Sequence, residues 1–190
     1  MSRFFWVRHG PTHAKTMVGW SDPPADLSDV AALERLNAFL PVEALVVSSD
    51  LSRAVATADA ITGERARLPH DPDLREIHFG AWELQTAETV EDPERLQHFW
   101  DKPGEVRPPG GESWNDVTAR VDRAVARLMA AQPGHDIIAV AHFGAILTQV
   151  QQALQVDAYN AFAQPIDNLS VSALRWACTG WRAERINHRP

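Results

Sequence analysis

Cysteine is almost missing from this 190-residue chain, in which Cys178 is the only example. A single thiol excludes an internal disulfide and a metal cluster held by several cysteines. The scarcity of cysteine is also typical of a reducing compartment. The apolar stretch at residues 4–7 is too short for a secretory signal, and Arg8 interrupts it. We therefore expect a cytoplasmic protein.

Long apolar runs and an excess of basic residues are missing as well. No run approaches the roughly 20 apolar residues of a membrane-spanning helix. Lys and Arg total 18 against 25 Asp and Glu, which gives a net charge of −7. A negatively charged chain is a poor candidate for nonspecific binding to nucleic acids or to membranes. We expect neither as a partner, so any anionic ligand must meet positive charge that is gathered locally.

Short apolar stretches typical of buried strands are present at residues 4–7, 44–47 and 137–141. Capping residues or apolar repeats of three and four predict helices over 28–39, 51–62, 112–131 and 145–154. This alternation of strand and helix favours an α/β fold with a mostly parallel sheet and helices on both faces. The length of the chain favours one domain over residues 1–190.

Two other parts of the chain complete the predicted architecture. Apolar segments at 169–176 and 181–186 predict a hairpin at the edge of the sheet, with its turn at Thr179-Gly180. Residues 86–103 are rich in acids and predict a small cap, helical in parts, over the carboxyl edge of the sheet. The apolar side chains of this cap that we expect to face inward are Leu96, Phe99 and Trp100.

Arg8-His9-Gly10 stands at the end of the first predicted strand, because Gly10 and Pro11 stop that strand at once. In an open α/β sheet, ligands collect at the carboxyl ends of the strands. An arginine there can grip a phosphate or a carboxylate with two hydrogen bonds. A histidine beside a phosphoryl group can act as a nucleophile. Taken alone, the tripeptide is also compatible with a surface Arg-His pair in a turn.

Two later residues repeat this placement. Arg53 falls in the first turn of a predicted helix, where a cation opposes the helix dipole unless an anion is bound there. His142 follows the third predicted strand as His9 follows the first. Because the carboxyl ends of parallel strands meet at one edge, these side chains predict a local positive pocket in an acidic protein. A phosphate monoester is the anion that best fits such a pocket.

Five segments, in this order along the chain, resemble the motifs of the histidine phosphatase superfamily, in its phosphoglycerate mutase-like branch. The first is Arg8-His9-Gly10-Pro11-Thr12, and the second is Ser48-Ser49-Asp50-Leu51-Ser52-Arg53-Ala54. The third combines Leu74-Arg75-Glu76 with Phe79-Gly80-Ala81-Trp82-Glu83. The last two are Pro109-Gly110-Gly111-Glu112-Ser113 and Ala141-His142-Phe143-Gly144. The resemblance covers nearly the whole chain.

The resemblance implies a metal-independent phosphatase that acts on small phosphorylated metabolites and needs no cofactor. His9 is implied as the nucleophile that becomes a phosphohistidine. It must be neutral to attack, so we expect its other ring nitrogen to donate a proton to an acceptor such as a backbone carbonyl. The residues implied to contact the phosphoryl group are Arg8, Gly10, Thr12, Arg53 and His142.

A carboxylic acid is also implied, to protonate the leaving oxygen and then to take a proton from water. The resemblance assigns this role to Glu76 and ranks Glu83 below it. His78 is expected as a wall of the pocket, and Trp20 as an anchor of the loop after the first motif. Burial would raise the pKa of the acid and the nearby cations would lower it, and the sequence does not decide between the two effects.

Two departures from the family pattern concern the phosphate pocket. Ala14-Lys15 stand where many relatives have Trp-Asn, so Lys15 offers a charge in place of an amide. Phe143 follows His142 where glycine is usual, and its ring predicts a narrower pocket.

Several alternatives are left open by the sequence. A phosphoglycerate mutase needs paired basic residues in its cap, whereas residues 88–101 are rich in acids and include only Arg95 as a base. A phosphate-binding module without catalysis is expected to lose the nucleophile or the acid, and this chain keeps His9 and Glu76. Ribazole phosphate phosphatases have a similar size. The apolar hairpin near the C-terminus leaves a homodimer open.

Overall fold

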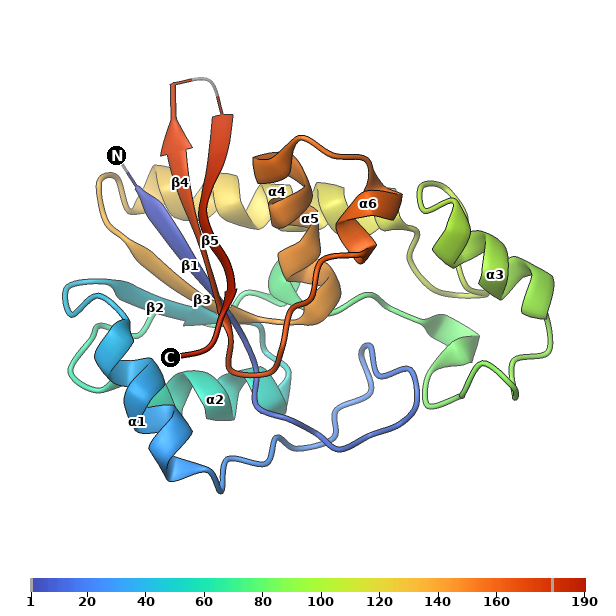
Figure 1. The fold of residues 1–190 in the computed structure, drawn as a ribbon, viewed down its shortest axis with the longest axis horizontal. Coiled ribbons are helices and arrows are strands. Elements are labelled where there is room, and N and C mark those ends of the chain that lie inside the picture. The colour runs from blue at the N-terminus through green and yellow to red at the C-terminus, as the bar shows by residue number, and fades with distance from the viewer. Residues whose placement is uncertain (1, 179) are drawn as a thin grey trace.

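The sheet is organised around β1 (Arg3–Arg8), which pairs in parallel with β3 (Ile137–Ala141) and antiparallel with β4 (Val171–Ala177). β2 (Leu45–Ser48) extends the parallel part beyond β3, and β5 (Gly180–His188) pairs antiparallel with β4. The strand order is therefore β2-β3-β1-β4-β5. The computed structural model describes residues 2–178 and 180–190 (Figure 1). Thr179, in the predicted turn, lies outside the described residues.

Helices cover both faces of the sheet because successive side chains of a strand point to opposite sides. Phe5 and Val7 pack in one apolar cluster with α1 (Val30–Phe39) and α2 (Ser52–Thr62). Phe4 and Trp6 belong to a second cluster with α4 (Trp114–Ala131) and α5 (Phe143–Leu154). Figure 1 shows α1 and α2 below the sheet and α4 above it. The predicted α/β fold, with a parallel core and an edge hairpin, is confirmed.

The helix starts show which capping predictions hold. Ser113 caps α4 as predicted, in a capping box with Asp116. The predicted cap of α1, Ser28, is wrong by one residue, because the side chain of Asp29 accepts the Ala32 N–H. α2 has no side-chain cap at Leu51. The serine hydroxyls before α2 bond elsewhere, and the Asp22 carboxylate accepts the Ser52 N–H instead, with Arg67 and His142 among the partners of the serines.

The predicted cap contains one helix, α3 (Pro93–Asp101), which starts at Asp92. Leu96 and Phe99 are buried in it, and Trp100 is partly exposed. A short helix that the sequence did not predict, α6 (Ala158–Phe162), lies beside α3, since the rings of Trp100 and Phe162 are 5.3 Å apart (Figure 1). Between α2 and α3 the chain is a loop with two 3-10 turns, η1 (Pro72–Leu74) and η2 (Gly80–Trp82).

None of the helices within residues 2–178 and 180–190 combines the length and the apolar character needed to span a bilayer.

Candidate active site

The carboxyl ends of β1, β2 and β3 lie side by side and place three polar residues together. β1 ends at Arg8, which is paired with Ala141 at the end of β3, and the His9 N–H donates to the Ala141 carbonyl at 3.1 Å. The rings of His9 and His142 lie 5.0 Å apart between centroids. The two strand-end histidines predicted from the sequence are therefore neighbours.

His9 is a buried histidine whose proton position is determined by a backbone atom. Its Nδ1 lies 2.7 Å from the Gly10 carbonyl oxygen. A carbonyl can only accept a hydrogen bond, so in the neutral ring Nδ1 carries the proton and Nε2 keeps a lone pair. The Arg53 Nε–H donates to this Nε2 at 3.3 Å. Burial, and then the Arg53 charge, lower the pKa of His9 to about 3, so the ring is neutral at pH 7.

His142 is fully buried and has the opposite hydrogen-bonding pattern. Its Nε2 lies 2.6 Å from the Ser49 hydroxyl, which follows β2. Its Nδ1 is buried and makes no hydrogen bond within the described residues. Burial, followed by the repulsion of His9, holds the pKa of His142 well below its usual value. When the Ser49 hydroxyl donates to Nε2, Nδ1 carries the proton and is a donor for a ligand.

Arg53 reaches the cluster from the first turn of α2 and is 1% exposed. Its Nη1 donates to the Ser21 carbonyl at 2.8 Å, and its Nη2 donates to the Gly19 carbonyl at 2.6 Å. The long loop after β1 thus supplies the acceptors that orient this guanidinium. Its remaining N–H, on Nε, faces His9.

Arg8 is partly buried and lies between the histidines and the segment before β4. Its Nη1 donates to the Ile166 carbonyl at 2.6 Å. Its guanidinium carbon lies 5.4 Å from the centroid of the Phe143 ring. Its Nε is buried and makes no hydrogen bond within the described part of the chain. Arg8 therefore has N–H groups that are free to bind an anion.

Glu76 is the buried acid of the cluster. Its Oε1 accepts the N–H groups of Ile77 and Gly144, both at 2.9 Å. Burial raises the pKa of the Glu76 carboxyl, against the opposing effects of these amides and of the Arg53 and Arg8 charges. Gly144 must be glycine here, because a Cβ would stand 2.5 Å from the Glu76 Oε1. The cluster thus combines an acid, a neutral histidine with a free lone pair and two cations.

These features accompany a match of residues 4–189 to the histidine phosphatase superfamily (branch 1). The chain belongs to this superfamily.

Several named phosphatases are similar to the chain. Glucosyl-3-phosphoglycerate phosphatase of Mycobacterium tuberculosis is 38% identical over 164 residues, which cover 76% of this chain and 71% of that protein. The structure of Bacillus stearothermophilus YhfR has a TM-score of 0.87 at 26% identity, with 97% of this chain and 96% of that one covered. The α-ribazole phosphatase of Shigella flexneri has a TM-score of 0.84 at 26% identity, with 98% and 96% covered.

A longer relative is a bifunctional protein of Mycobacterium tuberculosis, 35% identical over 147 residues. The match covers 75% of this chain and only 40% of that protein.

Glu83, the rival acid on the same loop of this histidine phosphatase, is a brace. Its carboxylate accepts the Trp20 and Ser21 N–H groups at 2.8 and 3.1 Å, and the Ser21 hydroxyl at 2.6 Å. Burial acts to raise the pKa of Glu83, but these donors, with Ser21 foremost, hold it below its usual value. A carboxylate of this kind fastens two loops together and is a poor proton donor.

The other predicted residues lie around the cluster. The Gly10 N–H donates to the Thr57 hydroxyl at 3.0 Å, in the loop after His9. Thr12 is partly exposed, and no hydrogen bond joins its side chain to the cluster within residues 2–178 and 180–190. Lys15 is exposed. Trp20 is a loop anchor, since its indole N–H donates to the Glu76 carbonyl at 2.9 Å and its ring lies 4.4 Å from His78.

Arg120 and Asn168 support the cluster and were not singled out from the sequence. Arg120 on α4 is 6% exposed and pairs with Glu112 at 2.7 Å. It also donates to the backbone carbonyls of Arg75 and Glu76, at 2.9 and 3.2 Å. Asn168 donates to the His9 carbonyl at 2.8 Å. No local pattern marks these residues, because a charge on an amphipathic helix or an amide in a loop is typical of a surface.

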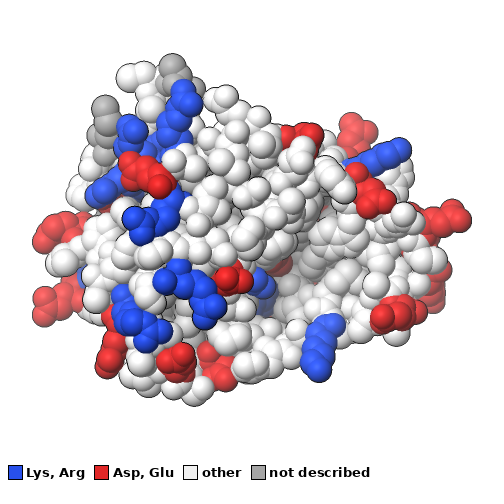
Figure 2. Space-filling view, viewed as in Figure 1, with Lys and Arg blue, Asp and Glu red and all other residues white. Residues whose placement is uncertain are grey.

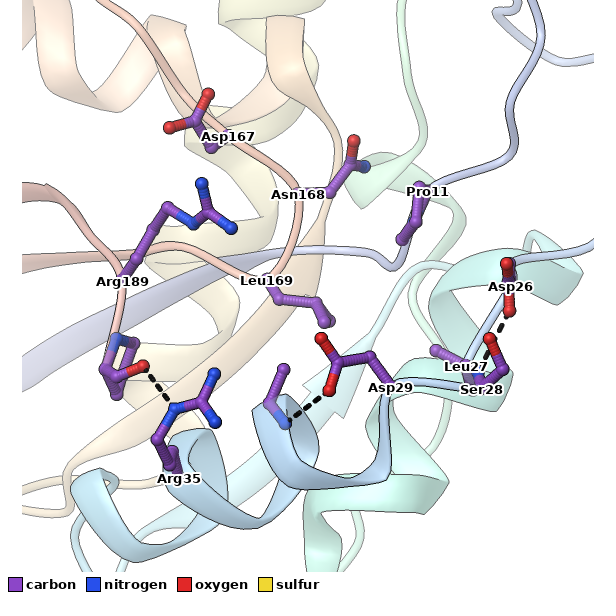
Figure 3. A pocket seen from close by; sticks show the side chains of 12 residues that line it. Pro11, Asp26, Leu27, Ser28, Asp29, Arg35, Asp167, Asn168, Leu169 and Arg189 are labelled. Atoms are coloured by element: carbon purple, nitrogen blue, oxygen red, sulfur yellow. Dashed lines mark hydrogen bonds between the residues drawn. The ribbon is translucent and has the colours of Figure 1, made fainter.

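A hollow of about 340 Å³ lies beside the cluster at the start of α1 (Figure 3). Asn168 and Pro11 line it, and Figure 3 shows the Arg35 and Arg189 side chains directed toward it. None of the five residues of the cluster lines this hollow: Arg8, His9, Arg53, Glu76 and His142. Within the described residues, no group of three or more His, Cys, Asp or Glu side chains is placed to hold a metal ion.

Proposed function

We propose that this chain is a phosphatase of small phosphate monoesters that works through a phosphohistidine at His9. The observation that carries the proposal is the 2.7 Å contact of His9 Nδ1 with the Gly10 carbonyl. It leaves the Nε2 lone pair free in a neutral ring, which is the form needed to attack phosphorus. The Arg53 Nε–H beside this Nε2 marks where a phosphoryl group is drawn in.

The phosphoryl oxygens meet donors from three strand ends. Arg8 and Arg53 provide charged N–H groups, and His142 provides a neutral N–H at Nδ1. Donors placed in advance around the phosphoryl group stabilise the charge that spreads over its oxygens in the transition state.

In the first step, the His9 Nε2–P bond forms and the ester P–O bond breaks. The leaving oxygen takes the proton of Glu76, whose raised pKa favours the protonated form. In the second step, water attacks phosphorus and gives a proton to Glu76, and the P–N bond breaks. Inorganic phosphate leaves, and His9 is neutral again.

Hydrolysis is favoured over transfer to a second substrate position. Arg95 is the only base in residues 88–101, and its Nε donates to the Arg107 carbonyl at 2.9 Å. It is therefore a poor candidate for holding the carboxylate of a phosphoglycerate. The similar proteins from Mycobacterium tuberculosis and Shigella flexneri are named as phosphatases of small metabolites, which supports the same class here. With a single cysteine, we place this activity in the cytoplasm.

The test is hydrolysis of p-nitrophenyl phosphate in the presence of EDTA by the wild type, His9→Ala and His135→Ala. His135 is an exposed histidine before β3 and serves as the matched control. We expect turnover in the wild type and the control and none in His9→Ala. Quenching in alkali should trap phosphate on the wild type alone. Turnover that survives in His9→Ala would contradict the proposal, and phosphate binding without turnover in the wild type would indicate a binding module.

A further inference from the structure

A row of aromatic side chains starts at the active site and runs to α3. The Phe143 and Phe162 rings are 6.5 Å apart, and the Phe162 and Trp100 rings are 5.3 Å apart. These three residues are partly exposed, whereas Phe79 and Trp114 behind them are buried. We call Phe143, Phe162 and Trp100 the aromatic wall. It joins three elements that are far apart in the sequence: α3, α5 and α6.

The near end of the wall lies among the groups that bind phosphate and protonate the ester. Phe143 directly follows His142, and its ring lies 5.4 Å from the Arg8 guanidinium carbon. Gly144, the next residue, donates its N–H to Glu76 at 2.9 Å. The wall therefore begins where the phosphoryl group and the acid meet.

The direction of the reaction places the alcohol of the substrate on this side. The attacking nitrogen and the leaving oxygen lie roughly in line through phosphorus, so the leaving oxygen points away from His9. It must also reach Glu76 for its proton. Because Glu76 is bonded to the Gly144 amide, the alcohol group leaves beside Phe143.

The surroundings of the wall offer little to a second anionic group. The three wall side chains are uncharged, and Figure 2 shows acidic side chains gathered around the end of the molecule that holds α3. Apart from Arg95, the ionised side chains of α3 are acids: Glu94 and Asp101. An aromatic ring on the substrate, by contrast, can stack on the wall and leave water.

We propose that the aromatic wall selects phosphate monoesters whose alcohol carries an aromatic or planar apolar group and no second anionic group. This inference rests on the proposed phosphatase function and assigns its substrate class. It also gives a use to Phe143, which stands where relatives usually have glycine.

The test compares 2-phenylethyl phosphate with ethyl phosphate, because both release a primary alkoxide and differ by the ring. We expect kcat/KM of the wild type to be at least about tenfold higher for the phenylethyl ester. Phe143→Leu and Phe162→Leu should each lower this ratio by about two- to tenfold, since a ring contact is lost. Phe162 has no ring contact with Arg8 within the described residues, so it tests the wall apart from the phosphate site.

Phe39→Leu is the control, because Phe39 is a partly exposed aromatic residue whose ring packs on His188, away from the cluster. It should keep the wild-type ratio. A wild-type ratio near one would overturn the aromatic wall and leave the phosphatase intact, provided that His9→Ala abolishes ethyl phosphate hydrolysis. Equal losses on both esters in the two wall variants would overturn it as well. If the wild type hydrolyses neither ester, both proposals fail.

Discussion

The ends of β1 and β3 carry similar residues with opposite hydrogen-bonding patterns. Each strand is followed by a buried histidine that the surroundings keep neutral. His9 uses Nδ1 to hold a backbone carbonyl, which leaves Nε2 free. His142 uses Nε2 to meet a hydroxyl, which leaves Nδ1 without a hydrogen bond within the described residues.

The difference shows how one residue type can serve two roles a few ångströms apart. The partner of the occupied nitrogen decides what the other nitrogen offers. A carbonyl partner leaves a lone pair, which is suited to attack on phosphorus. A hydroxyl partner that donates leaves an N–H, which is suited to binding a phosphoryl oxygen. Three predictions test this comparison.

The largest expected effect separates the two histidines by glutamine substitution. Glutamine keeps an N–H donor and has no nucleophilic nitrogen. We expect His9→Gln to lower kcat on p-nitrophenyl phosphate by about 10,000-fold or more. His142→Gln should lose about tenfold, and His142→Ala about 100- to 1,000-fold. Steady-state kinetics measure all three, and equal losses in the two glutamine variants would contradict the division of roles.

The next effect concerns the proton that neither histidine supplies. Glu76→Gln should lower kcat/KM for glycerol phosphate by about 100-fold or more, since an alkoxide needs protonation. The loss on p-nitrophenyl phosphate should be small, because p-nitrophenolate is a good leaving group. The ratio of the two rates should also fall as the pH rises through the raised pKa of Glu76, which removes the acid form. In Glu76→Gln this ratio should no longer change with pH.

Glu83→Gln is the matched control for this experiment. Glu83 braces two loops through Trp20 and Ser21, so its variant should affect both substrates equally. A leaving-group dependence that disappears in Glu83→Gln and persists in Glu76→Gln would reverse the assignment of the acid.

The smallest effect tests the hydroxyl that orients His142. Ser49→Ala removes the partner of Nε2 and frees the ring to carry its proton on either nitrogen. Losing one hydrogen bond predicts about a tenfold fall in kcat/KM for p-nitrophenyl phosphate. Ser48→Ala is the control, because the Ser48 hydroxyl accepts from Arg67 at 2.6 Å and does not contact His142. Equal falls in both variants would count against a role for Ser49 in the tautomer.

The parts of the fold that sequence patterns predicted well are those with a strong local signal. β1, β2 and β3 are continuous apolar runs, as expected of parallel strands covered on both faces. α6 has only one turn or so, Ala158–Phe162, and no periodic pattern. Its Phe162 ring packs 4.6 Å from Trp114 on α4, a contact between distant segments that no local pattern shows. The single domain over residues 1–190 and the homodimer stay predictions.

The site was predictable where its residues stand at strand or helix ends, and less so where they act through others. Arg8, His9, Arg53 and His142 were marked by position, and the structure brings them together with Glu76. The catalytic roles of these residues stay predictions. The hydroxyl of Ser49 was expected among the helix caps and bonds His142 instead. Arg120 acts on the Glu76 loop from α4, across a distance in sequence that only folding closes.

The acceptor that holds His9, the Gly10 carbonyl, has a further consequence for how the protein tolerates mutation. Every amino acid carries this oxygen, so no codon change at position 10 can delete it. The orientation of the nucleophile is therefore insulated from genetic drift in a way that His142, held by the side chain of Ser49, is not. In natural variants of this chain, errors of proton placement should accumulate at position 49 and spare the loop at position 10.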